Sequence, residues 1–192
     1  MTVSLTAPIS ETDYRSMPNV LKLPADITGD AITTLLNEAW DHITNWCQQP
    51  LSKTSTTETI RFKSKFANLQ PDGYLHVLPR FKPLISVTSL AWSVGITANG
   101  WTATTNFDAL IAPENEIIVY DAPFTRADFG FIQAVYYSGL DPVPDRLKML
   151  CAFVTSHLLS GSMFPSQGGS SILPSWLPKE MKDIIDRHRR IV

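Results

Sequence analysis

The sequence predicts an α+β fold in which two long helices bracket a small antiparallel sheet along the chain. Apolar residues recur at three- and four-residue spacing after Thr28 and again after Pro144, which is the pattern of amphipathic helices. Between Thr59 and Gly139 the spacing changes to two and turn residues interrupt it, which is the pattern of antiparallel strands. The helical segments therefore lie on both sides of the strands in the sequence.

The composition indicates a protein that is part of an assembly. The chain has 192 residues, enough for one core with appendages. Hydrophobic residues make up 44% and charged residues only 18%, which leaves little charge to keep a small monomer soluble. The net charge of -2 gives no field that would concentrate nucleic acid or an anionic membrane. Since the sequence shows neither a secretory signal nor an apolar stretch of the ~18 residues that a membrane helix needs, we expect a cytosolic origin and no membrane partner.

The first long helix is predicted between Thr28 and Pro50. Thr28 can cap its start, Asp30 suits the positive first turn, and Pro50 stops it. Cys47 in this helix and Cys151 in the second one are expected to be buried, reduced thiols. The apolar stripe of the first helix comprises Ile32, Leu35, Leu36, Ala39, Trp40, Ile43 and Trp46.

The middle of the chain predicts a meander of mainly antiparallel strands. In the first strand, Ile60, Phe62, Ser64 and Phe66 would point to one side, and Arg61, Lys63 and Lys65 to the other. Turn signals separate the later strands. These strands are predicted at residues 74–81, 84–93, 107–111, 116–120 and 130–137.

The second long helix is predicted to begin at Pro144 and to end at Gly161, because proline favours the first turn of a helix and glycine favours its end. Glycine and serine are frequent at residues 167–171, which predicts a flexible link. A last short helix would run from about Pro178 to Arg190, detached from the core by that link.

Three parts of the chain follow from these elements. Residues 1–24 are predicted to form a flexible, extended N-terminal arm, because prolines interrupt any periodicity there. Residues 25–161 would form the core of helix, inserted sheet and helix. Residues 162–192 would form the linker and the C-terminal tail helix.

The sequence shows no motif for catalysis, for a cofactor or for a metal ion. His42 and Cys47 lie five residues apart and Cys151 and His157 six, whereas ligands on one helix face lie three or four apart. A Gly-x-Ser-x-Gly elbow is missing as well. An alternative is a small hydrolase built on the densest acidic neighbourhood, although these residues sit at turns and a helix start, where aspartate is common without catalysis. The four acids are Asp121, Asp128, Asp141 and Asp145.

Two basic segments are candidates for partner contact. A second alternative is a single-stranded nucleic-acid binding module on the strand from Arg61 to Lys65. We favour a solvated or subunit-facing strand, because the phenylalanines would point away from the cations. In the tail, arginine can anchor a partner, as it is enriched at interfaces. The residues predicted to contact a partner are Trp176, Met181, Ile185, Arg187, Arg189 and Arg190.

Four landmarks together resemble the head-to-tail connector, or adaptor, family of tailed bacteriophages. They are the opening helix at residues 30–47, the segment at 79–90, the segments at 135–140 and 144–151, and the proline-led close at 173–190. The chain departs from short family members in its N-terminal arm and in an extended loop between Thr97 and Asn106. The likeness covers about residues 26–190.

The resemblance implies a fold and a role. The fold would be a helical bundle of long helices with an inserted small antiparallel sheet. The protein would be a structural, non-enzymatic virion component without a cofactor, made in the host cytoplasm and placed in the neck. It would form a 12-subunit ring between the portal protein and the next connector, a stopper or tail protein, with DNA passing through the lumen as cargo.

Overall fold

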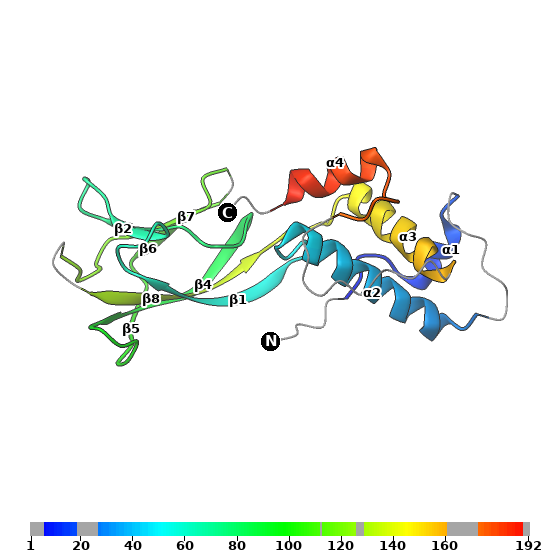
Figure 1. Cartoon of the computed structure of the whole chain (residues 1–192). Coiled ribbons are helices and arrows are strands. Elements are labelled where there is room, and N and C mark those ends of the chain that lie inside the picture. The colour runs from blue at the N-terminus through cyan, green and yellow to red at the C-terminus, as the bar shows by residue number, and fades with distance from the viewer. Residues whose placement is uncertain (1–5, 19–26, 112, 126–128, 161–172, 190–192) are drawn as a thin grey trace. The chain divides into compact units, whose positions relative to one another are not determined.

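The chain folds into two compact units. The computed structural model describes residues 6–18, 27–111, 113–125, 129–160 and 173–189. Unit 1 combines the two ends of the chain, Met1–Leu51 and Pro142–Val192, and unit 2 is the continuous middle, Ser52–Asp141. In the described residues, unit 1 contains the helices and unit 2 the strands (Figure 1).

Unit 1 is organised around two helices, α2 (Gly29–Cys47) and α3 (Asp145–Leu159), which run in opposite directions and pack against each other (Figure 1). The side chain of Thr28 accepts a hydrogen bond from the Ala31 amide and caps α2, as predicted. At its other end Gln48 adopts a left-handed conformation with φ 57°, shortly before Pro50. The helices are α1 (Glu11–Ser16), α2 (Gly29–Cys47), α3 (Asp145–Leu159) and α4 (Lys179–His188).

The apolar stripes of α2 and α3 form the core of unit 1. Trp40 is fully buried, in agreement with the predicted stripe. Cys47 and Cys151 are buried, unpaired thiols, which confirms the prediction, and the Cys151 thiol lies 3.7 Å from the Leu36 carbonyl oxygen. The fully buried residues of the two stripes include Ile32, Ala39, Ile43, Leu147, Leu150 and Val154.

The prediction of a flexible, extended N-terminal arm is wrong for the described residues of that segment. Ser10 and Asp13 form a reciprocal capping box that starts α1. Tyr14 on this helix is fully buried, and its hydroxyl hydrogen-bonds to Ser156 of α3 at 2.8 Å. The Ala7 amide donates to the side chain of an α2 residue at 2.9 Å. A cap and one anchoring aromatic therefore fix this short segment although prolines flank it.

Unit 2 contains two four-stranded sheets, and every strand pair in them is antiparallel. Sheet 1 has the order β1-β8-β4-β5, and sheet 2 has the order β2-β3-β7-β6. The strands of sheet 1 are β1 (Thr54–Arg61), β8 (Gly130–Ser138), β4 (Leu84–Val94) and β5 (Thr102–Thr104). Those of sheet 2 are β2 (Ala67–Leu69), β3 (Leu75–Val77), β7 (Glu116–Val119) and β6 (Phe107–Leu110).

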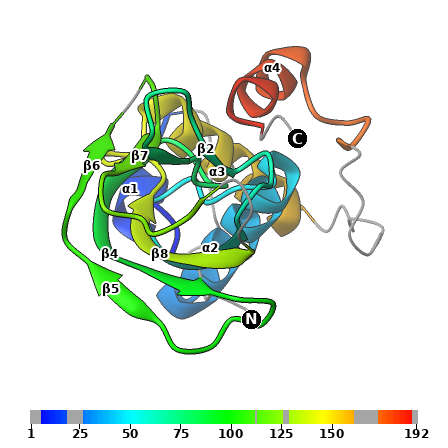
Figure 2. The ribbon, with the colours of Figure 1, turned by 90° about the vertical axis from the view of Figure 1, so that its left-hand side faces the viewer.

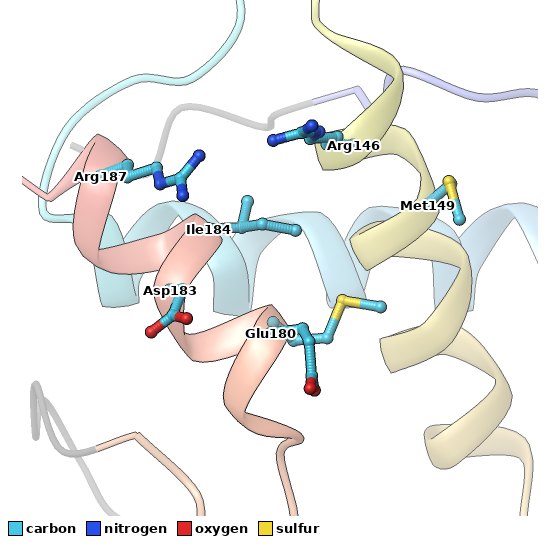
Figure 3. A pocket seen from close by; sticks show the side chains of 7 residues that line it. Arg146, Met149, Glu180, Asp183, Ile184 and Arg187 are labelled. Atoms are coloured by element: carbon cyan, nitrogen blue, oxygen red, sulfur yellow. The ribbon is translucent and has the colours of Figure 1, made fainter.

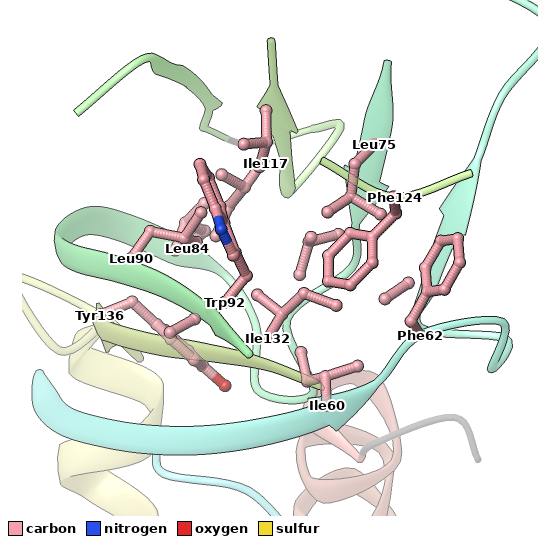
Figure 4. Close-up of a cluster of buried hydrophobic side chains, with 14 residues drawn as sticks. Ile60, Phe62, Leu75, Leu84, Leu90, Trp92, Ile117, Phe124, Ile132 and Tyr136 are labelled. Carbon is pink, nitrogen blue, oxygen red and sulfur yellow. The ribbon is translucent and has the colours of Figure 1, made fainter. Parts of the chain in front are cut away.

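One hydrophobic cluster joins the inner faces of the two sheets (Figure 4). Along β8 every second residue is buried, as expected for a strand with one face in a core. The Tyr136 hydroxyl donates a hydrogen bond to Glu58 at 2.8 Å, which satisfies its polar end. The cluster draws Ile60, Leu84, Leu90, Trp92, Ile132 and Tyr136 from sheet 1 and Leu75, Val77, Ile117 and Val119 from sheet 2. Unit 2 is therefore a β-sandwich.

The predicted fold class is wrong. The structure is not a bundle of long helices with a small inserted sheet: in the described residues, helix and strand contents are about equal, and the strands form two four-stranded sheets. The sheet residues bury a core of their own. Strand pairing between distant segments produced this outcome, and pairing is not visible in local periodicity.

The predicted first strand is also corrected. β1 ends at Arg61, and Lys63 follows in a turn with φ 62°. The alternation of apolar and basic residues from Ile60 to Phe66 therefore does not belong to one strand. The Ser64 amide donates to the Arg61 carbonyl at 3.2 Å and closes this turn. β2 and β5, of three residues each, were not predicted.

Candidate functional site

The predicted partner-binding residues lie on and around α4 in unit 1. Trp176 precedes this helix, Met181 and Ile185 lie within it, and Arg187 and Arg189 lie at its end. Arg190 lies outside the described residues.

The helix α4 packs on its own subunit. Ile185 is fully buried and Leu177, just before the helix, is 2% exposed. The Cys47 thiol donates to the Ile185 carbonyl oxygen at 3.7 Å, and the Arg189 guanidinium donates to the Trp46 carbonyl oxygen at 3.3 Å. The Ile185 carbonyl group and the Arg189 side chain therefore hold α4 against the end of α2.

Trp176 lies in an aromatic stack on α3. Its ring centroid is 3.9 Å from that of His157 with an interplanar angle of 19°, and 6.4 Å from that of Phe153. Stacked rings bury apolar area against each other. Trp176 therefore fixes the segment that leads into α4.

A groove of about 390 Å³ runs between α3 and α4 (Figure 3). Its apolar part includes Met149, which is 52% exposed. Methionine adapts to irregular partners because it is unbranched and polarizable. The groove is lined by Arg146, Met149, Glu180, Met181, Asp183, Ile184 and Arg187.

Charges of opposite sign flank this groove. Figure 3 shows the side chains of Arg146 and Arg187 on one side of Ile184 and those of Glu180 and Asp183 on the other. Neither arginine forms a salt bridge with the described residues. An apolar segment of a partner that ends near a carboxylate would pack on the methionines and pair with the guanidinium groups.

The buried thiols of unit 1 do not favour nucleophilic chemistry. Burial raises the pKa of Cys47 to about 12 and that of Cys151 to about 12, so both thiols stay protonated near neutral pH. Burial, with a smaller effect of the neighbouring Arg187, lowers the pKa of His188. These groups act in packing.

The acidic residues considered for a hydrolase have separate partners. Asp121 accepts hydrogen bonds from Thr104 at 2.9 and 3.0 Å. Asp128 lies outside the described residues. Asp141 pairs with Lys53 at 3.1 Å and Asp145 with Lys148 at 3.1 Å.

The described part of the chain has no group of three or more His, Cys, Asp and Glu that could hold a metal ion. None of its helices is long and apolar enough to span a membrane.

A charged cluster on sheet 2 was not predicted from the sequence. His76 Nε2 lies 2.9 Å from Asp72 and its Nδ1 lies 2.8 Å from Glu116. Burial alone would lower the pKa of His76, but the hydrogen bonds to Glu116 and Asp72 outweigh it and raise that pKa. The His76 ring, hydrogen-bonded at both nitrogens, joins the β2–β3 turn to β7.

Because the folded-state pKa of His76 is raised, its contribution to stability is fully present below pH of about 6.5 and is lost as the pH rises through the folded-state pKa. We expect His76→Gln to weaken this decline in the free energy of unfolding between pH of about 6 and 8. Urea titrations across that range measure it. Glu116→Gln, which removes one partner, should give a similar profile, and an unchanged slope in both variants would contradict the assignment.

Among the comparisons with known proteins, only the search of solved structures gives matches. No family model matches this sequence, and no curated protein matches it. Six chains of solved structures match the fold. One belongs to a structure described as "Neck of empty GTA particle computed with C6 symmetry": it aligns with 100% of this chain and 94% of that chain, with a TM-score of 0.63 and 14% identity. The two chains share a fold.

Proposed function

We propose that this chain is a structural subunit of the neck of a phage-like particle, where the head joins the tail. The observation that carries the proposal is the fold shared over the full chain with a chain from the neck of a GTA particle. The order of four landmarks, which resembles the head-to-tail connector family, supports the same role. They lie at residues 30–47, 79–90, 135–140 with 144–151, and 173–190. The work of such a subunit is assembly, and the proposal includes no catalysed reaction.

The finer proposal is an adaptor ring between the portal and the next connector or tail protein. The neck structure that contains the matching chain was computed with C6 symmetry, and rings of six or of twelve copies both obey that symmetry. We propose twelve copies around a lumen through which DNA passes without being read. The low charged content of 18% suits a subunit with much of its surface covered by neighbours.

The groove between α3 and α4 is the surface we propose for docking on the portal or the next connector. Of the predicted tail residues, Met181 and Arg187 line it. Ile185 and Arg189 position α4 from behind, through their contacts with α2. Arginine and exposed methionine next to an apolar floor are typical of residues that contribute strongly to protein interfaces.

The location can be tested on particles. Antibodies against this chain should label the head–tail junction in negative-stain micrographs of native particles. Deleting its gene should yield separate heads and tails, and expression from a plasmid should restore joined particles. Label at another position, or joined particles in the deletion strain, would contradict the proposed function.

A further inference from the structure

Charges of opposite sign collect at opposite edges of the β-sandwich in unit 2. In the described residues, basic side chains gather where β1 leads into β2. Acidic side chains gather on β6 and on both sides of β7. The basic set is Arg61, Lys63, Lys65 and Arg80, and the acidic set is Asp108, Glu114 and Asp121.

The topology places these two sets on different edges. β1 and β5 are the edge strands of sheet 1, and β2 and β6 are those of sheet 2. Residues 62–66 connect β1 to β2 and residues 105–106 connect β5 to β6, so the edges pair as β1 with β2 and β5 with β6. Figure 2 shows β5 and β6 on the same side of the strand unit. We call the edge formed by β1 and β2 the basic edge and the edge formed by β5 and β6 the acidic edge.

The basic edge combines cations with aromatic rings. Lys63 Nζ lies 5.3 Å from the ring centroid of Phe129, a residue that is 56% exposed. Lys65 Nζ lies 5.0 Å from the centroid of Phe66, and the Arg80 guanidinium lies 5.8 Å from the same ring. Arg80 also pairs with Glu58, whereas the two lysines form no salt bridge with the described residues.

The acidic edge also combines charge with aromatic rings. The Tyr120 hydroxyl donates to Asp108 at 2.7 Å, and the Tyr120 ring meets Tyr74 edge-on with centroids 4.9 Å apart. The two tyrosines are 38% and 41% exposed. Glu114 is exposed in the turn before β7. Tyrosine faces can accept a cation as well as bury apolar area.

We infer that the basic edge of one subunit binds the acidic edge of a second copy of this chain, head to tail. The inference deepens the proposed ring and rests on it. Two different, complementary edges on one chain make a heterologous contact, and such contacts close into rings when the rotation between copies is suitable. A two-fold dimer through either edge alone would bring like charges together.

The contact depends on charge, so salt should weaken it. The Debye length falls from about 10 Å at 0.1 M to about 3 Å at 1 M ionic strength. Reversing two charges on one edge should weaken self-association at low salt by more than about tenfold, since attraction becomes repulsion. Both edges use exposed side chains, and reversal therefore leaves the sandwich core intact.

The test uses the full chain and two double variants. Arg61→Glu with Lys65→Glu makes both edges acidic, and Asp108→Lys with Glu114→Lys makes both edges basic. Sedimentation velocity at low and high salt should show self-association of the wild type at low salt, monomers for each double variant, and restored association when the two variants are mixed. Glu38→Lys with Lys179→Glu, on exposed positions of α2 and α4, is the control and should associate like the wild type.

Three results would overturn the inference: a wild type that stays monomeric at high concentration and low salt, double variants that associate like the wild type, or a mixture that stays monomeric. Loss of binding to a single-stranded oligonucleotide by the Arg61→Glu, Lys65→Glu variant, with a monomeric wild type, would instead assign the basic edge to nucleic acid. These measurements are independent of the antibody labelling. A label at the neck together with unaffected variants keeps the proposed function and rejects this contact.

Discussion

Replacing Trp40 by alanine is expected to lower the free energy of unfolding of unit 1 by about 3–5 kcal/mol, as truncation of buried aromatic residues does. Trp40 lies on the buried face of α2 and is fully buried, so the substitution leaves a cavity in the middle of the helix pair. Thermal and urea unfolding followed by circular dichroism measure the loss.

A matched control lies on the same helix. Leu35 was assigned to the same stripe from the sequence, yet it is only half-buried, and Leu35→Ala should cost clearly less than Trp40→Ala. Equal losses, or a melting temperature of Trp40→Ala within about two degrees of the wild type, would show that the α2 stripe is not the centre of the core.

A chain that ends at Ser166 is expected to lose stability. The sequence alone predicts that removing the tail spares the fold, because the glycine- and serine-rich link would detach it. In the structure, the removed segment contains Ile185, which is fully buried, and Leu177, which is 2% exposed. Losing one such side chain costs about 2–5 kcal/mol, and the truncation removes both together with the Trp176 stack.

Point variants separate stability from partner binding. Ile185→Ala should reproduce a large part of the truncation's loss in a thermal melt. Met149→Asp and Arg187→Glu change exposed residues of the groove, so they should leave the melt nearly unchanged while weakening a portal pull-down. A truncated chain that melts like the wild type would refute the packing role of α4.

Sequence reasoning located the elements whose boundaries are set locally. α2 starts at Thr28, whose side chain accepts a hydrogen bond from the amide three residues later. It ends at Gln48, which has a left-handed backbone conformation and is soon followed by Pro50. α3 starts after Pro144 without a side-chain cap hydrogen bond, and a proline followed by Asp145 in the first turn marks its start. α1 was missed because six residues show too little periodicity, although the Ser10 and Asp13 box is a recognisable start signal.

The double sheet was not predictable from the same patterns. β2 and β5 have three residues each, too few to show alternation. Their pairing is also non-local: β3 lies between β2 and β7, and the last of these begins about forty residues further along the chain. The sequence pattern therefore predicted one meander of strands and not two separate sheets.

The contact of the tail residues with a partner stays a prediction, and the structure shows only where these residues lie. Met181 and Arg187 were named from the tail sequence, and both line the groove. Arg146 and Met149, which complete it, were missed because they belong to α3 and reach α4 only through tertiary packing. Ile185 was predicted to contact a partner because it lies on the tail segment, but an apolar residue of a short helix can equally pack on its own subunit.

The discontinuity of unit 1 links the folding of the two units through the chain itself. Its halves are separated by the whole of Ser52–Asp141, and closing an unfolded loop of that length costs about 4 kcal/mol in chain entropy. Once unit 2 is folded, the β1–β8 ladder pairs Thr54 with Ser138. This pairing keeps the first and last residues of unit 2 close together. A mutation that unfolds the sandwich therefore reintroduces this entropic penalty into the helical unit, even when it changes none of the contacts there.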